Sequence, residues 1–330
     1  MAKLVGLFNT VHSPFCFNPP ERWNDVRGAR RLRADVPVDD LEVCRAKSAR
    51  IQQAFGTLRQ KIADAKPDVL IVFGDDQLEN FNFNNFPTFA VYVGQEFEGT
   101  LTTTANVVYD PNAERPRVKM QGKPDLAVNI LTGLMKRGFD PAFSMDLPNP
   151  ERGIGHAVMR PTQAVTDKNI PTIPVLLNCY YAPQVTAKRA SELGRAVRQV
   201  IDEYPQDLRV GVVGSGGLWH TPGAQDAWLN EDFDRKMLGH LADGDVRGMA
   251  ETFDSYKVPD GDASQYIGER GRGTTGMPSP GGPQGGTRET CNWIAAAAVA
   301  DGQPWTVVDY VPVYSSPVGA AFAYSGVSGS

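Results

Sequence analysis

The stretch from Asp207 to His220 constrains the fold more than any other part of the chain. It reads Leu-Arg-Val-Gly-Val-Val and continues into Gly-Ser-Gly-Gly-Leu-Trp-His. A short apolar, β-branched run with charge before it and glycines after it predicts a buried strand of a parallel sheet. The glycines allow a sharp turn at the carboxyl end of the strand, where open α/β sheets bind their ligands. We therefore expect His220 at such an edge, although a single histidine there is more often a packed core residue.

Apolar runs alternate with helical patterns along the rest of the chain. Strands are predicted at residues 3–8, 68–74, 88–93, 173–177, 208–213 and 305–314, the last being the final strand, and helices at 39–65, 123–137, 187–201, 228–241 and from Thr287 onward. Residues 19–37 show no helical period and are predicted to be an irregular loop that reaches over a site. This order predicts an α/β fold: one domain, residues 1–330, with a mainly parallel central sheet flanked by helices.

Composition excludes several classes of protein. The 330 residues are 41% hydrophobic and 22% charged, so a large core can form without disulfides or a structural metal. The formal net charge of −5 gives no general attraction to phosphate backbones, so no nucleic-acid partner is expected. Four scattered cysteines without a CxxC pair indicate a reducing, cytoplasmic setting. The apolar run at the amino terminus is too short for a signal peptide, and no stretch is long enough for a membrane span.

Residues 260–286 differ from the rest because they are rich in glycine and proline and lack periodicity, which predicts a lid or loop. They contain a GxGxxG pattern at 271–276, but no strand precedes it and Pro278 follows where a helix should begin. We therefore predict no dinucleotide site.

Three of the four histidines fall at turns that could share one site. His12 follows the first strand, His156 lies in a glycine-flanked turn, and His220 follows the strand described above, while Glu289 heads the last helix. Chance would rarely distribute histidines this way, so a shared polar site is favoured over three separate packing residues. Histidine and carboxylate ligands that leave open positions suit a non-haem Fe(II) centre.

At these residues the chain resembles the class III extradiol ring-cleavage dioxygenases, the family that contains the catalytic subunit of protocatechuate 4,5-dioxygenase. The resemblance covers nearly the whole length. It rests on His-Ser-Pro at 12–14, the strand ending in Asp76-Gln77, Gly-His-Ala-Val-Met at 155–159, Gly-Ser-Gly-Gly-Leu-Trp-His at 214–220, Asn-Glu-Asp-Phe-Asp at 230–234, and Glu289 with Asn292-Trp293. It implies the fold of this family and an oxidoreductase that cleaves a catechol-like or related hydroxylated aromatic compound with O2 at Fe(II).

The resemblance also implies roles for individual residues. His12 and Glu289 would be iron ligands, His220 an acid/base for the proton on bound oxygen, and His156 a group that deprotonates or orients the substrate. The family's second histidine ligand is replaced by Gln77. An amide oxygen is a neutral and weaker donor than imidazole, so iron affinity should fall.

Three outcomes of this replacement stay open at the level of sequence. Gln77 ligates the metal weakly and ordinary chemistry continues; or Asp76, Glu79 or a water completes an altered site, with another metal as one option; or the metal is lost. The last case would leave a metal-independent lyase or hydrolase that uses the retained histidines on an aromatic-like substrate. A third hypothesis is a non-enzymatic relative of the family that binds a partner through the cleft used for catalysis in the dioxygenases.

Substrate contacts are expected from aromatic side chains that flank a planar ring and from an arginine that clamps a carboxylate. The candidates are Tyr180, Tyr181, Trp219 and Arg160. The expected partners are a small aromatic substrate and O2, together with further copies of the chain in a homo-oligomer or a small second subunit of the kind that some relatives need.

Overall fold

The computed structural model describes residues 1–28, 30–100, 117–149, 152–166, 169–221, 224–262 and 277–326. Eight of the strands formed by these residues make one sheet, in the order β6-β3-β7-β2-β8-β1-β10-β9. They are β1 (Lys3–Thr10), β2 (Val69–Asp75), β3 (Phe89–Tyr92), β6 (Ala142–Ser144), β7 (Thr172–Leu177), β8 (Arg209–Ser215), β9 (Thr306–Val313) and β10 (Val318–Ser325). A separate antiparallel pair consists of β4 (Glu96–Thr100) and β5 (Arg117–Gln121).

The centre of the sheet is parallel. β2 pairs in parallel with both β7 and β8, and β8 pairs in parallel with β1. β6 is parallel to β3, whereas β3 is antiparallel to β7, and β10 is antiparallel to both β1 and β9. The predicted α/β domain with a mainly parallel sheet is therefore confirmed. The parallel order brings the carboxyl ends of β1, β2, β7 and β8 to one edge.

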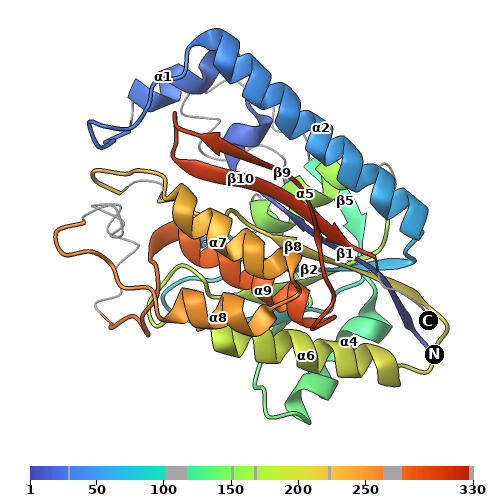
Figure 1. Cartoon of the computed structure of the whole chain (residues 1–330). Coiled ribbons are helices and arrows are strands. Elements are labelled where there is room, and N and C mark those ends of the chain that lie inside the picture. The colour runs from blue at the N-terminus through green and yellow to red at the C-terminus, as the bar shows by residue number, and fades with distance from the viewer. Residues whose placement is uncertain are drawn as a thin grey trace.

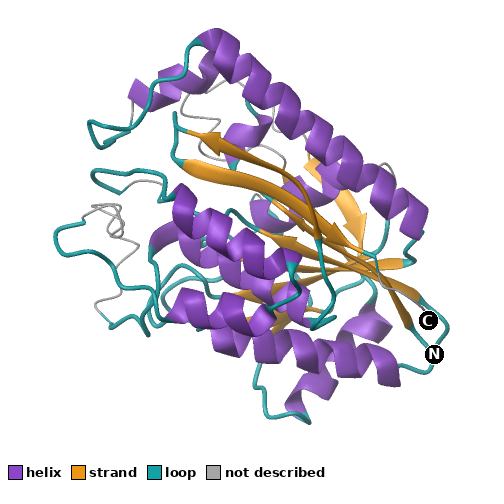
Figure 2. Ribbon diagram, in the orientation of Figure 1, coloured by secondary structure: helices purple, strands orange, loops and turns teal. Residues whose placement is uncertain are grey.

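Helices cover both faces of this sheet (Figures 1 and 2). The helices among the described residues are α1 (Trp23–Gly28), α2 (Leu41–Ala65), α4 (Pro124–Met135), α5 (His156–Val165), α6 (Ala187–Glu203), α7 (Glu231–Ala242), α8 (Val246–Asp254) and α9 (Thr290–Ala298), with 3-10 turns at Pro14–Phe17, Pro20–Arg22 and Gly285–Glu289. One hydrophobic cluster lies between the sheet and α4, α6, α7, α8 and α9, and a second lies between the sheet and α2 and α5. No helix in these described ranges is long and apolar enough to cross a membrane.

Local sequence explains the long helix α2. The Asp40 side chain accepts a hydrogen bond from the Val43 backbone N–H at 2.8 Å and caps the first turn. Ile51, Phe55 and Leu58 recur at helical spacing and are buried against the sheet. The predicted helix at 39–65 is thus confirmed, with its start set by the cap.

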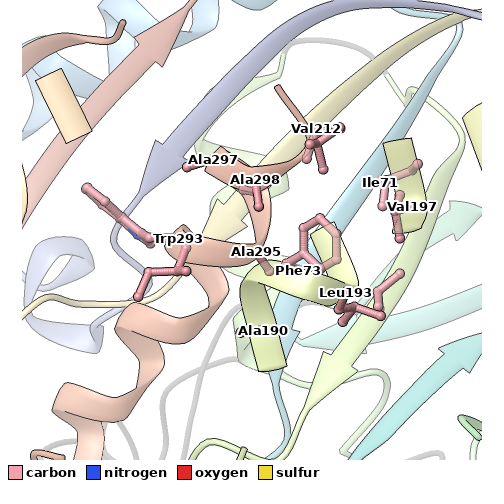
Figure 3. Packing of buried hydrophobic residues seen from close by; sticks show 14 of the residues in the cluster. Ile71, Phe73, Ala190, Leu193, Val197, Val212, Trp293, Ala295, Ala297 and Ala298 are labelled. Atoms are coloured by element: carbon pink, nitrogen blue, oxygen red, sulfur yellow. The ribbon is translucent and has the colours of Figure 1, made fainter. Parts of the chain in front are cut away.

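The core beneath the sheet depends on a close helix–helix approach (Figure 3). Ile71, Phe73 and Val212 of the sheet face Leu193 and Val197 of α6 and the alanines of α9. The backbones of α6 and α9 touch at Gly194, where an added Cβ would lie 2.1 Å from the Ala295 carbonyl oxygen. This packing holds the start of α9, and with it the residues just before it, against the edge of the sheet.

Some predicted elements were wrong in extent or type. The helix expected at 228–241 begins at Glu231, because Asn230 caps it by accepting from the Phe233 N–H at 3.1 Å. The strand expected at 305–314 is present as β9 but is not the last, since β10 follows it.

Residues 19–37 were predicted as irregular, yet they contain α1, with Trp23 fully buried. His156 is the first residue of helix α5 rather than part of a turn. Most of the proposed lid at 260–286 lies outside the described residues.

Candidate metal and acid-base site

Buried polar side chains from distant parts of the chain meet at the carboxyl edge of the sheet. His12 follows β1, Asp75 is the last residue of β2, and Ser215 is the last residue of β8. Glu289 ends the 3-10 turn that leads into α9. All four residues are buried, with relative exposures of 0–1%. His12, Asp75 and Glu289 each offer one ligand atom, and these three atoms lie within 4.8 Å of one another.

Hydrogen bonding fixes which nitrogen of His12 is free. The Ser215 hydroxyl donates to the Ala157 carbonyl oxygen at 2.5 Å, so its oxygen must accept from His12 Nδ1–H at 3.0 Å. In the neutral ring, His12 Nε2 then carries a lone pair. This atom lies 2.9 Å from Glu289 Oε2 and 3.8 Å from Asp75 Oδ1. It makes no hydrogen bond within the described part of the chain. A buried lone pair that faces two carboxylates fits a bound cation.

Glu289 is the centre of the cluster. Its Oε1 lies 3.2 Å from His220 Nε2 and accepts from Gln77 Nε2 at 3.1 Å, while its Oε2 accepts from the Gly217 N–H at 3.2 Å. Burial alone would raise the pKa of this carboxyl, but its favourable interactions with His12 and His220 outweigh burial and hold the pKa well below its usual range. The carboxylate is therefore ionised and available as a ligand.

Gln77 presents its amide nitrogen to the cluster. Nε2 donates to Asp75 Oδ2 at 3.1 Å and to Glu289 Oε1 at 3.1 Å. Carboxylate oxygens accept hydrogen bonds, so the amide group of Gln77 must turn its NH2 group, and not its oxygen, toward these two partners. Burial, with the neighbouring charge of Glu289, raises the pKa of Asp75 to about 7. The amide thus bridges two carboxylates that would otherwise repel each other.

His156 stands beside this cluster and is held by Glu79. The His156 and His12 rings meet edge to face, with centroids 4.8 Å apart. Glu79 Oε1 accepts from His156 Nδ1 at 2.6 Å and from the His156 backbone N–H at 3.0 Å. Burial would raise the pKa of Glu79, but the charge of His156 and its hydrogen bonds lower it to about 2. Gly155 makes room for this carboxylate, because its φ is +102° and an added Cβ would lie 2.8 Å from Glu79 Oε2.

His220 is clamped between two glycines. An added Cβ at Gly217 would lie 2.5 Å from His220 Nδ1, and one at Gly286 would lie 2.2 Å from His220 Nε2. The Thr287 hydroxyl accepts from the His220 N–H and donates to the His220 carbonyl, both at 3.1 Å. Burial would lower the pKa of His220, but the Glu289 carboxylate outweighs it and the pKa is raised. The Glu289 carboxylate therefore stabilises the protonated form of the ring.

The residues proposed for substrate contact do not all lie in the same environment. Trp219 is fully buried, and its Nε1 donates to the Trp228 carbonyl at 2.8 Å within an aromatic core cluster. Arg160 is 1% exposed and donates to the His12 carbonyl at 3.2 Å. Its buried position suits support of the His12 backbone better than a clamp on a substrate.

Tyr180 and Tyr181 belong to an aromatic group at the end of β7. Their ring centroids are 5.5 Å apart, and Tyr181 also meets the rings of Phe83 and Phe86 at 5.3 and 5.1 Å. Phe83 is 48% exposed, so this group reaches the surface. Burial, followed by the charges of carboxylates at the end of β2 and just after it, raises the pKa of Tyr181.

The sequence analysis missed two residues of the cluster, Asp75 and Ser215. Asp75 and Ser215 end buried strands, and that position was the available signal. Asp76 was considered instead, but its carboxylate accepts from the backbone N–H groups of residues 78, 80 and 81 and closes its own turn.

Comparison with known proteins gives the class of this protein. Residues 41–263 match the family described as the catalytic LigB subunit of aromatic ring-opening dioxygenase, and the chain belongs to this family. The matched range contains Gln77, His156 and His220 but neither His12 nor Glu289.

Several named relatives are similar over part of the chain. The 2,3-dihydroxyphenylpropionate/2,3-dihydroxicinnamic acid 1,2-dioxygenase of Photorhabdus laumondii is 30% identical over 179 residues, which is 54% of this chain and 50% of that protein. Its counterpart in Rhodococcus globerulus is 26% identical over 192 residues, covering 58% and 55%. A gallate dioxygenase of Pseudomonas putida is 30% identical over 140 residues, covering 41% and 40%. The chain thus spans about half the length of these relatives in the matched regions. A solved structure of an uncharacterised Escherichia coli K12 protein aligns over 98% of this chain, with TM-score 0.49 and 12% identity.

Proposed function

We propose that this protein is a ring-opening dioxygenase that cleaves a catechol-like or related hydroxylated aromatic compound with O2 at a non-haem Fe(II) site. The observation that carries the proposal is the unpaired lone pair of buried His12 Nε2, which faces Glu289 and lies beside two further histidines. Family membership and the names of the relatives support the same reaction class.

The residues present fit a metal of this kind. His12 and Glu289 would hold it, with a third group from the end of β2, and a neutral imidazole with ionised carboxylate is a suitable donor set for Fe(II). Fe(II) bound there would supply Lewis acidity toward the substrate hydroxyls and a route for electrons to dioxygen. The remaining work falls to the side chains around it.

His156 would take the proton from a substrate hydroxyl. Glu79 can only accept hydrogen bonds, so it keeps the His156 proton on Nδ1 and leaves Nε2 of the neutral ring as the base. The backbone N–H of His156 is bound to the same oxygen, which holds the Glu79 carboxylate beside the ring.

His220 would deliver a proton on the other side of Glu289. Its raised pKa favours the protonated ring, and the two flanking glycines leave the ring little room to move. A histidine that can accept a proton and a second that can donate one suit a reaction that removes one proton and returns another.

The aromatic group of Tyr180, Tyr181, Phe83 and Phe86 would form a wall for the substrate ring. Residues 260–286 would act as the lid of this single domain. We further propose a cytoplasmic enzyme that forms a homo-oligomer or recruits a small second subunit.

Oxygen uptake tests the proposal. Protein loaded anaerobically with Fe(II) is mixed with 2,3-dihydroxyphenylpropionate, catechol, protocatechuate or gallate, and O2 consumption is followed together with ring-cleavage products. We expect turnover on at least one of them, abolished by a chelator and by His220→Gln. Conversion of a substrate that continues without O2 and with a chelator would refute the proposal in favour of a metal-independent lyase or hydrolase.

A further inference from the structure

The end of β2 shows how this chain could dispense with the second histidine. Gln77 uses its amide nitrogen to hold one oxygen of each neighbouring carboxylate, Asp75 Oδ2 and Glu289 Oε1. The other oxygen of each carboxylate, Asp75 Oδ1 and Glu289 Oε2, faces His12 Nε2. Three donor atoms therefore converge, and Gln77 is not one of them.

We propose that Asp75 is the third metal ligand and that Gln77 is a positioning residue that holds both carboxylates. The ligand set would be one histidine and two carboxylates, His12, Asp75 and Glu289. This inference rests on the proposed function only in taking the site to be a metal site. It gives the site two negative charges where two histidines and one carboxylate would give one.

The distances suit a single ion. Ligands about 2.1 Å from an octahedral ion lie about 3.0 Å apart when adjacent and about 4.2 Å apart when opposite. The pairs His12–Glu289 at 2.9 Å and His12–Asp75 at 3.8 Å lie near this range. The whole set, within 4.8 Å, needs only a small contraction to close on an ion.

The surroundings of Asp75 also support its role. Its side chain is fully buried, and Asn292 Nδ2 donates to the Oδ1 atom at 3.4 Å while donating to the Ser215 carbonyl at 2.8 Å. Each ligating oxygen thus has a protein donor behind it: Asn292 for Asp75 and the Gly217 N–H for Glu289. Hydrogen bonds of this kind orient ligands in metal sites. When both buried carboxylates are ionised they need positive charge nearby, which a divalent cation would supply.

Manganese binding tests the assignment without any catalytic assay. Mn(II) is added to metal-free wild-type protein, and the loss of the free-ion electron paramagnetic resonance signal gives affinity and stoichiometry. We expect one Mn(II) per chain. Asp75→Asn should weaken binding about 100-fold or more and Gln77→Ala about tenfold, because losing an outer hydrogen-bond partner typically costs 10- to 100-fold and losing a ligand costs more.

Asp76→Asn is the matched control, since it makes the same change at the next residue, equally buried but turned into its own loop. It should leave the affinity within about threefold, as expected for a residue that neither ligates nor orients a ligand. Circular dichroism establishes that each variant is folded, and Asp75→Ser replaces Asp75→Asn if the latter is not.

The assignment is overturned if Gln77→Ala abolishes binding while Asp75→Asn changes it less than a few-fold, because Gln77 would then be the ligand. Wild-type protein that binds no Mn(II) overturns it as well. If Mn(II) binds and is lost in Asp75→Asn, while Fe(II)-loaded protein consumes no O2 with any substrate, the ligand set stands and only the proposed function fails.

Discussion

Asp234 gives the sharpest test of the electrostatics of this fold. The residue lies in the first turn of α7 and is fully buried. Its Oδ1 accepts from the Trp219 N–H at 2.7 Å and its Oδ2 accepts from the Tyr310 hydroxyl at 2.8 Å. Burial raises its pKa from 3.8 to about 8 in spite of these bonds and of the nearby charge of His220, and Glu231 adds to the rise. The native state therefore holds a proton on Asp234 that the unfolded chain releases above pH 4.

The sign of the effect on stability follows from proton linkage. Between the unfolded pKa and the folded pKa the native state binds more protons, so the stability contributed by Asp234 is complete below pH 4 and is lost as the pH rises toward 8. Each pH unit costs about 1.4 kcal/mol, or about 4 kcal/mol between pH 5 and pH 8. Asp234→Asn removes this loss, because an amide can donate to the Tyr310 oxygen and accept from the Trp219 N–H.

Guanidinium unfolding followed by tryptophan fluorescence at pH 5, 6, 7 and 8, on metal-free protein with a chelator present, measures the effect. The free energy of unfolding of Asp234→Asn minus that of the wild type should grow with pH at about 1.4 kcal/mol per unit. Asp232→Asn, an exposed change on the same helix, should run parallel to the wild type. Parallel curves for Asp234→Asn and wild type would refute the claim that the buried carboxyl is protonated.

The remaining predictions concern residues that orient histidines. Glu79→Gln should lower turnover about 100-fold, the usual contribution of a positioned base, because the new amide nitrogen can place the His156 proton on the wrong ring nitrogen. Oxygen uptake at unchanged metal content measures the effect. Unaltered turnover would count against a role for Glu79 in orienting His156. Ser215→Ala should weaken Mn(II) binding about tenfold, because the hydroxyl that holds the His12 proton on Nδ1 is lost, and losing such an outer hydrogen-bond partner typically has an effect of this size. Equal affinity in the variant and the wild type would show that the serine is dispensable.

Much of the fold could be predicted because its central strands are strong signals. β2 and β8 are continuous apolar runs buried along nearly their whole length, and such runs are typical of strands in parallel sheets. β10, in contrast, reads Val-Gly-Ala-Ala-Phe-Ala-Tyr-Ser, a composition with little strand preference. It is stabilised by antiparallel pairing with β1 on one side and β9 on the other, and this pairing depends on the assembled sheet.

The candidate site was predictable in its histidines and in Glu289, but not in Asp75. Turn and strand-end positions marked His12, His156 and His220. Which of the neighbouring acids Asp75 and Asp76 faces the cluster depends on the turn after β2, where the backbone N–H groups draw the second carboxylate away. Residue order alone does not specify that choice.

The positions of His12 and Glu289 in the chain have a consequence for folding. An ion held between them would act as a non-covalent cross-link that closes a loop nearly as long as the protein, and its binding free energy would add directly to that of folding. During synthesis such a cross-link can form only after Glu289 has left the ribosome. The segment shared with the family, residues 41–263, contains neither end of it. Strands β1, β2, β7 and β8 all precede Glu289 in the chain, so they can pair before the cross-link forms, and metal uptake would report that the start of the last helix has docked.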